Sequence, residues 1–201
     1  HYLKTKQGGE HTLAEVEKYN AGVLLKADVR KPAQVHKMVL QFVKAAGGID
    51  VLVNNAGDLI DRQPFESATV AYHDDVYQTN VRSIFLVTQA ALPHLKKSGG
   101  CIINISSLSR AGNFGQSNYS AAKAGVAALT VVWAKELARH EIRVNAIAPG
   151  YMATENTRAL REDPARNKAI LERIPAGRWG TPQDLQGAAV FLGSAASDYV
   201  T

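Results

Sequence analysis

The sequence contains a single cysteine, Cys101, among its 201 residues. One cysteine cannot form an internal disulfide, and its scarcity favours a reducing compartment, so we expect a cytoplasmic protein. The chain also lacks any run of 18 apolar residues, and with it the usual sequence signature of a membrane-spanning helix. Its six histidines are dispersed and show no zinc-ligand spacing, so we expect no metal site.

The sequence also has no cluster of basic or of acidic residues. The formal net charge is +5, but no basic run is longer than two residues, as at Lys96-Lys97. Proteins that bind nucleic acid usually carry a clustered basic patch, so we expect no nucleic-acid partner and no membrane partner. A solvated surface and a phosphorylated ligand account better for the positive charge.

What the chain does contain is an alternation of short apolar segments and longer segments of helical periodicity. We expect strands at about residues 23–27, 49–53, 101–105 and 144–147. We expect helices from Pro32 to the glycines at 47–48, at about 68–80, 81–97 and 119–140, and after Thr181. This alternation predicts an α/β fold with a doubly wound parallel sheet and right-handed crossovers, in one domain that spans residues 1–201.

The segment from Asn118 to Lys123 points most directly to chemistry. Tyr119 and Lys123 are four residues apart, so they lie on one face of a helix. A free tyrosine has a pKa of about 10, which is too high for a base near neutral pH. A nearby ammonium group stabilises the phenolate and lowers that pKa, so the pair predicts an acid/base catalyst.

The surroundings of this pair resemble the short-chain dehydrogenase/reductase family. Small residues fill the helix around it, and the sequence Ile105-Ser106-Ser107 ends a strand 12 residues before Tyr119. The resemblance implies a Rossmann-like fold and an oxidoreductase that moves a hydride between NAD(P)(H) and a CH–OH or carbonyl group. Tyr119 and Lys123 would be catalytic and would also contact the cofactor.

The resemblance also implies a catalytic serine at the strand end. Ser107 matches the second serine of the family's usual pair. An ungapped count points to Ser106 instead, because the following loop is one residue shorter than is common. We favour Ser107, since the strand end should be kept while the loop absorbs the deletion.

Further family motifs occur in the correct order. Asn80 matches the asparagine that completes a catalytic tetrad, kinks a helix and holds a water against the lysine. The family's Asn-Asn-Ala-Gly motif, which backs the cofactor's ribose and steadies the sheet, implies cofactor-binding roles for Asn54, Ala56 and Gly57. All of these positions lie at or just beyond predicted strand ends or helix breaks.

Two more segments match cofactor-binding loops of the family. Asp28 and Val29 match the pair that contacts the adenine ring. The loop that begins at Pro149-Gly150 follows the strand at 144–147, and its Met152 backbone and Thr154 hydroxyl would hold the nicotinamide carboxamide. That contact would fix which face of the ring offers the hydride.

Two parts of the family pattern are missing from these 201 residues. The Gly-rich phosphate-binding turn does not occur, and His1-Tyr2 resembles the end of the family's second strand. We therefore expect the first strand, the Gly-rich loop and the first helix upstream of residue 1, and the final strand after residue 201. Lys4 and Lys6 follow the second strand where NAD-dependent members commonly carry an acid, which predicts a preference for NADP over NAD.

The substrate class stays open between two groups. Residues 150–154 and 173–180 resemble gluconate and deoxygluconate dehydrogenases, whereas residues 112–119 resemble 3-oxoacyl carrier-protein reductases. Two other functions share parts of the pattern: a non-catalytic nucleotide-binding regulator, and a sugar-nucleotide epimerase or dehydratase. The regulator would be expected to lose Tyr119 or Lys123, and the epimerase needs a longer C-terminal domain. The family resemblance also predicts a homotetramer.

Overall fold

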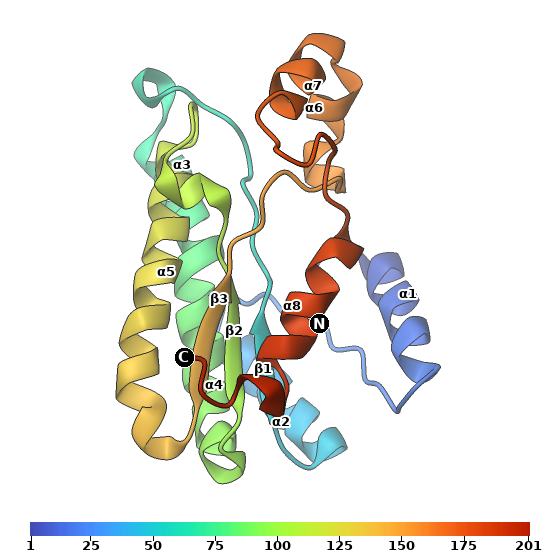
Figure 1. Ribbon diagram of the computed structural model, residues 1–201. Coiled ribbons are helices and arrows are strands. Elements are labelled where there is room, and N and C mark those ends of the chain that lie inside the picture. The colour runs from blue at the N-terminus through green and yellow to red at the C-terminus, as the bar shows by residue number, and fades with distance from the viewer.

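The computed structural model describes residues 1–201 and places a parallel sheet at the centre of an α/β fold (Figure 1). The sheet has three strands in the order β1 (Val51–Asn54), β2 (Cys101–Ile105) and β3 (Arg143–Ile147). All neighbours are parallel, and Cys101 on β2 pairs with Val51 and with Arg143. The expected parallel sheet of an α/β fold is therefore confirmed.

Helices cover both faces of this sheet (Figure 1). On one face lie α4 (Ser83–Ser98) and α5 (Ser117–Leu137), and α2 (Pro32–Ala46) packs against α4. On the other face lies α8 (Gln186–Leu192), with α1 (Lys6–Glu17) beyond it. The core between the sheet and the first face includes fully buried Ile84, Leu95, Ile102, Val126 and Val144.

Glycines end two helices where the sequence predicts. The residues after α2 and α4 are Gly47 and Gly99, with φ values of 84° and 62°. A residue with a Cβ rarely adopts these left-handed conformations. At its other end, α2 begins at Pro32, whose ring fixes φ for a first helical turn.

The chain between α3 (Val70–Tyr77) and α4 does not break at Asn80, contrary to the two separate helices expected there. It passes instead through a π-helical turn, η2 (Gln78–Arg82). Such a turn holds one residue more than an α-helical turn and is common at functional sites. The turn widens the helix locally while the backbone stays hydrogen-bonded, as Ser83 N donates to Gln78 O.

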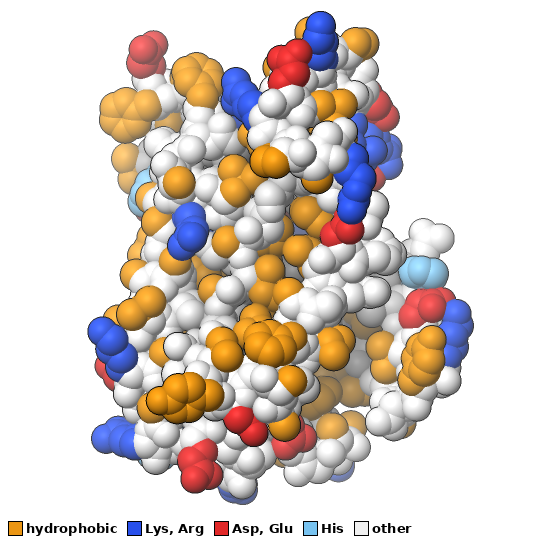
Figure 2. Space-filling view, in the orientation of Figure 1, with side chains coloured by type: hydrophobic (Ala, Val, Ile, Leu, Met, Phe, Trp, Pro, Cys, Tyr) orange, Lys and Arg blue, Asp and Glu red, His pale blue; other side chains and the backbone are white.

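A small lobe stands above the carboxyl ends of the strands, and the sequence reasoning did not identify its helices. It is built from η5 (Glu155–Thr157), α6 (Arg158–Glu162) and α7 (Pro164–Leu171). The side chain of Asp163 caps α7 by accepting hydrogen bonds from two backbone amides. Figure 2 shows Lys and Arg side chains over this lobe, intermixed with acidic ones.

Short 3₁₀ turns complete the fold. They are η1 (Phe65–Ser67), η3 (Leu108–Ala111), η4 (Ala138–His140), η6 (Pro182–Leu185) and η7 (Ala195–Ser197). Thr181 caps η6 in a capping box with Asp184, and the helix expected after Thr181 begins as this 3₁₀ turn and continues as α8 from Gln186. None of the helices combines the length and apolar character needed to cross a bilayer.

The prediction of a regular strand at residues 23–27 is wrong. Only one parallel bridge forms there, between Tyr2 and Lys26. Its two backbone hydrogen bonds join Tyr2 N to Leu25 O at 3.0 Å and Ala27 N to Tyr2 O at 3.1 Å. A β-ladder needs several consecutive residues paired between two strands, whereas this segment pairs with Tyr2 alone.

Candidate active site

A cleft of about 560 Å³ lies at the carboxyl ends of the three strands. This is where open parallel sheets bind their ligands, because the loops that follow the strands diverge there. The loop after each strand contributes lining residues, and the predicted site residues among them are Gly57, Ser107, Tyr119, Lys123, Pro149, Gly150, Met152 and Thr154. The structure therefore gathers most of the predicted site into one cleft.

Tyr119 and Lys123 lie one turn apart on α5, as their spacing predicts. Lys123 is 3% exposed, and its Nζ donates a hydrogen bond of 2.9 Å to the carbonyl oxygen of Ile105. The same Nζ lies 5.6 Å from the centre of the Tyr119 ring. Burial lowers the pKa of Lys123 to about 8, so the ammonium form still predominates at neutral pH.

The expected effect of Lys123 on Tyr119 is not what the structure shows. Burial raises the pKa of Tyr119 above its usual value, a hydrogen bond with the Ser107 side chain opposes that rise, and the Asp58 carboxylate adds to it. Burial therefore outweighs any lowering by the lysine, and the prediction of a net lowered pKa for Tyr119 is wrong for this structure. The physical reason is that the Lys123 ammonium is directed at the Ile105 carbonyl while the phenol is largely removed from water.

The two candidate serines differ in what their hydroxyl groups contact. Ser106 is 4% exposed, and its Oγ donates a hydrogen bond of 2.8 Å to the backbone oxygen of Lys123. Both serines line the cleft, but Ser107 is half-buried and its side chain interacts with Tyr119. Its Oγ also accepts a hydrogen bond from Ser109 N at 3.1 Å. This geometry favours Ser107 as the serine that meets a substrate.

Asn80 anchors the loop that follows β1. Its Nδ2 donates to Asp58 O at 2.6 Å and to Val76 O at 2.9 Å, and its Oδ1 accepts from Asp58 N at 3.2 Å. A Cβ added to Gly57 would lie 2.7 Å from Asn80 Oδ1 and 3.2 Å from Lys123 Nζ. The π-helical turn thus presses Asn80 against a loop position that only glycine fits.

Asn54 lies beneath the cleft rather than in it. Its Nδ2 donates to Thr88 Oγ1 at 3.0 Å and to Asn104 Oδ1 at 2.9 Å, and Asn104 in turn donates to Thr130 Oγ1 at 2.9 Å. This buried chain of hydrogen bonds ties β1 and β2 to α4 and α5. Ala56 is half-buried and does not line the cleft either.

Asp28 and Val29 are both buried and lie outside the cleft. The Asp28 carboxylate makes an ion pair of 2.9 Å with Arg30, and its backbone amide donates to Gln34 Oε1 at 2.7 Å. The hydrogen bond from Arg30 holds the pKa of Asp28 below its usual value. The carboxylate is therefore an anchor for its own loop.

The loop after β3 is held from both sides. Leu108 N donates to Pro149 O at 2.9 Å, and Thr157 Oγ1 donates to Met152 O at 2.6 Å. Met152 also forms a parallel bridge with Gly180, where an added Cβ would lie 2.7 Å from the Met152 sulfur. Thr154 is exposed at the mouth of the cleft. The expected nicotinamide loop is therefore held in shape by contacts within the protein.

Among the cleft residues that sequence reasoning did not single out are Arg62, Gln116 and Tyr151. Arg62 and Tyr151 lie on loops after β1 and β3, and Gln116 immediately precedes α5. No short motif marks them. The sequence could have indicated these residues only by their position, since each lies within or a few residues from a predicted motif.

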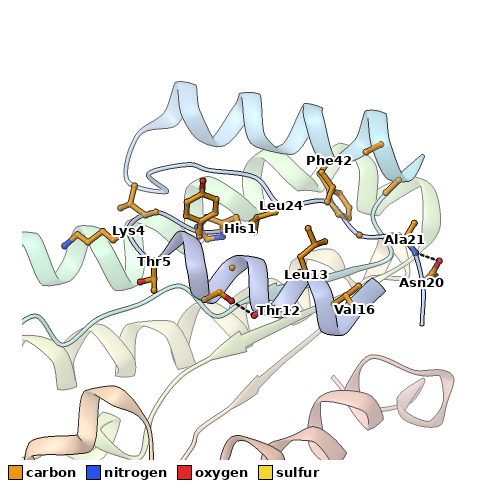
Figure 3. A pocket seen from close by; sticks show the side chains of 18 residues that line it. His1, Lys4, Thr5, Thr12, Leu13, Val16, Asn20, Ala21, Leu24 and Phe42 are labelled. Carbon is orange, nitrogen blue, oxygen red and sulfur yellow. Dashed lines mark hydrogen bonds between the residues drawn. The ribbon is translucent and has the colours of Figure 1, made fainter. Parts of the chain in front are cut away.

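A larger cavity of about 830 Å³ lies at the other side of the molecule, between α1, residues 20–24 and the end of α2 (Figure 3). Apolar side chains line its centre, among them Leu13, Leu24 and Phe42. Polar groups at its rim bond to the backbone nearby, as Thr12 Oγ1 does to Gly8 O. Its lining includes His1, Tyr2 and Lys4 but none of the residues expected to be catalytic.

Comparisons with known proteins agree with this geometry. The sequence model of a short-chain dehydrogenase/reductase family, described as enoyl-(acyl carrier protein) reductase, matches residues 1–201. This chain therefore belongs to the short-chain dehydrogenase/reductase family of oxidoreductases.

Two relatives differ in the substrates that their names state. The chain is 50% identical to the 2-dehydro-3-deoxy-D-gluconate 5-dehydrogenase of Escherichia coli (strain K12), over 88% of this chain and 70% of that enzyme. It is 45% identical to the 3-oxoacyl-(acyl-carrier-protein) reductase of Thermotoga maritima, over 84% of this chain and 68% of that enzyme. Both groups were expected from the sequence.

A solved structure matches closely as well. It is the crystal structure of a gluconate 5-dehydrogenase from Burkholderia cenocepacia J2315 in complex with NADP and tartrate. The TM-score is 0.91 at 36% identity, and the match covers 98% of this chain and 78% of that one. The family and its Rossmann-like fold are thus confirmed by sequence and by structure.

Proposed function

We propose that this site transfers a hydride between NADP(H) and a carbonyl or secondary alcohol carbon of a small polar substrate. The observation that carries the proposal is the meeting of Ser107, Tyr119 and Lys123 in one cleft at the carboxyl ends of the strands. NADP(H), when bound, supplies or accepts the hydride. The side chains of this protein manage the proton and the charge on the substrate oxygen.

Tyr119 is placed to donate the proton, since burial raises the pKa of its phenol and the group is therefore protonated at neutral pH. A phenol that stays protonated at neutral pH is in the state needed when a carbonyl becomes an alcohol. The Ser107 hydroxyl, which interacts with Tyr119, provides a second donor for the oxygen on which negative charge develops. Lys123 places a buried ammonium beneath the phenol and stabilises the phenolate left behind.

The residues of the cleft fit the nicotinamide end of the cofactor. Gly150 and Met152 line one wall, and Gly57 allows the close approach of the opposite loop. Asn80 would position that loop, and a water beside Lys123 would link the site to solvent. The proposed adenine contacts are Asp28 and Val29, at the end of the segment that pairs with Tyr2.

The preference for NADP would depend chiefly on Lys4. Tyr2 bridges to Lys26, so Lys4 follows an extended segment at the edge of the expected adenosine site. Lys6 already pairs with Glu10 at 2.8 Å, whereas Lys4 forms no ion pair and its side chain points away from the cavity in Figure 3. An unpaired ammonium favours a 2′-phosphate over a free hydroxyl.

For the substrate, we propose a sugar acid first and a 3-oxoacyl thioester second. The sugar-acid class is supported by the names of the E. coli and B. cenocepacia relatives. The thioester class is supported by the T. maritima relative and by the segment that leads into Tyr119. Both classes place a carbonyl between the same serine and tyrosine.

We also propose that the protein assembles as a homotetramer. Three apolar side chains on α4 and α5 remain 46–54% exposed: Phe85, Val131 and Val132. A second group of exposed apolar side chains lies on and after α8, and includes Val190 and Tyr199. Large apolar side chains that remain exposed together on one element are a feature of subunit contacts.

The experiment that tests the function is Tyr119→Phe in the full-length protein. We expect NADPH-dependent turnover to fall by at least about 100-fold, the range for loss of a general acid, while the circular dichroism and melting temperature stay unchanged. Tyr77→Phe, at a tyrosine stacked on His73 outside the cleft, is the matched control. Turnover of Tyr119→Phe at the wild-type rate would refute the mechanism.

A further inference from the structure

A small cavity of about 160 Å³ adjoins the reaction cleft. The two cavities share four lining residues: Arg62, Asn113, Tyr151 and Leu160. Residues of α7 close the far side of the small cavity, on the lobe above the strands. A ligand that reacts at Tyr119 could therefore extend one end into this cavity, which we call the side pocket.

The side pocket is lined by three arginines, Arg62, Arg166 and Arg173, and by no carboxylate. None of the three forms an ion pair anywhere in the structure. Arg62 is half-buried, and its guanidinium has no hydrogen-bond partner in the protein. Burial and the nearby Arg166 lower the pKa of Arg62, which is the signature of a positive charge that lacks a counter-ion.

The backbone holds Arg62 close to the reacting groups. Gln63 N donates a hydrogen bond of 3.2 Å to Gly115 O. Arg62 Cγ lies 3.8 Å from the position that a Cβ would take on Gly115, a residue with φ of 69°. The loop that carries Arg62 therefore rests on the loop that leads into α5, four residues before Tyr119.

A second polar group in the cleft lacks a partner. Gln116 is 3% exposed and lines the cleft, and its Oε1 has no hydrogen-bond donor within reach. A buried acceptor without a donor is unfavourable, because it has given up its hydrogen bonds to water. A hydroxyl group of a bound molecule would supply the missing donor.

We propose that Arg62, with Arg166 behind it, binds a carboxylate group of the substrate while the carbon that exchanges the hydride lies at Tyr119. Gln116 Oε1 would accept a hydrogen bond from a hydroxyl between these two ends. A guanidinium fork matches the two oxygens of a carboxylate in shape and charge. The assignment rests on the proposed hydride transfer and narrows its substrate to hydroxy or keto acids.

Gluconate and sorbitol form a suitable pair of probes, because they share a chain of hydroxyl groups and differ by a carboxylate at one end. In the full-length protein saturated with NADP, we expect Arg62→Gln to weaken gluconate binding about 10- to 100-fold, the loss expected for one charge-assisted contact. Calorimetry measures this loss without turnover. Sorbitol binding should stay unchanged, as should gluconate binding by Arg158→Gln, which removes an exposed arginine outside both cavities.

Steady-state kinetics provide the second readout. Arg62→Gln should raise KM for gluconate with little change in kcat, because the carboxylate contact is the same before and during reaction. Gln116→Leu should weaken the binding of gluconate and of sorbitol by the same factor. An Arg62→Gln variant that binds gluconate as well as wild type does, or that loses gluconate and sorbitol equally, would overturn the carboxylate assignment.

The same experiment separates this assignment from the proposed function. If the protein reduces acetoacetyl thioesters but does not bind gluconate, the carboxylate assignment is overturned and hydride transfer stands. If gluconate binds through Arg62 but no substrate of either class is turned over, the assignment of Arg62 stands and the proposed function fails.

Discussion

The side chain of Ser106 donates a hydrogen bond of 2.8 Å to the backbone oxygen of Lys123, the residue whose ammonium lies beside Tyr119. This bond occupies the hydroxyl proton of Ser106 and fixes α5 to the end of β2. Ser107, the next residue, lines the cleft and interacts with Tyr119. Adjacent serines thus differ in their contacts: Ser106 is bound to the backbone of α5, whereas Ser107 interacts with Tyr119.

The first prediction separates the roles of the two serines. Ser107→Ala should lower kcat about 100-fold or more, as loss of an oxyanion donor does, and should leave thermal stability within a degree or two. Ser106→Ala should lower the free energy of unfolding by about 1–3 kcal/mol, because the Lys123 carbonyl loses a buried donor. Urea titration and initial rates measure the two effects. The reverse pattern would assign the catalytic role to Ser106.

The second prediction concerns pH. Burial lowers the pKa of Lys123 from 10.5 to about 8, so the folded protein holds fewer protons than the unfolded chain between those values. Stability therefore rises with pH across that window, and the cost of the buried charge is present in full below about pH 8. Between about pH 8 and pH 10.5, the free energy of unfolding of the wild type should rise by up to about 3 kcal/mol relative to that of Lys123→Met.

Urea unfolding of both proteins at several pH values measures this gain, since other titrating groups cancel in the difference. Activity plays no part in the readout. A difference between wild type and Lys123→Met that stays constant across the window would show that the ammonium is not desolvated.

The third prediction concerns cofactor preference. Lys4→Glu should lower the ratio of kcat/KM for NADPH to that for NADH about 10- to 100-fold, because one phosphate–lysine contact is replaced by repulsion. Lys6→Glu should change the ratio less, since Lys6 already pairs with Glu10. A wild-type enzyme that prefers NADH, or equal effects of the two substitutions, would contradict this account.

The fourth prediction concerns assembly. Static light scattering should give the mass of four protomers at micromolar concentration. Val132→Glu places a charge on the exposed apolar face of α5 and should shift the mass to dimer or monomer. Thr12→Glu, on the exposed face of α1, is the control. A wild-type mass of one protomer would rule out the tetramer.

Local signals predicted much of this structure. Gly47 and Gly99 end their helices because their left-handed backbone conformations suit glycine, and that preference is visible in the sequence. The Tyr119/Lys123 pair was recognisable because both residues lie on one helix. Each of these features depends on neighbours within a few positions.

The misses depend on residues far apart in the chain. The segment at 23–27 has strand-forming residues, yet pairing needs a neighbour, and only Tyr2 provides one. The pKa of Tyr119 depends on burial by several elements and on the direction of the Lys123 ammonium. The side pocket brings together Arg62 and Arg166, which no local pattern connects.

The π-helical turn at Gln78–Arg82 also limits how this segment can change in length. Deleting one residue there would convert the wide turn into a regular α-helical turn and leave the rotation of α3 relative to α4 nearly unchanged, because the π-helical turn holds one extra residue. Such a change would not harm the helix itself, but it would carry Asn80 away from the loop at Gly57 and Asp58. The number of residues between α3 and α4 is therefore constrained by the contacts of Asn80 in the candidate site. We expect insertions and deletions to be tolerated less well here than in other parts of the chain.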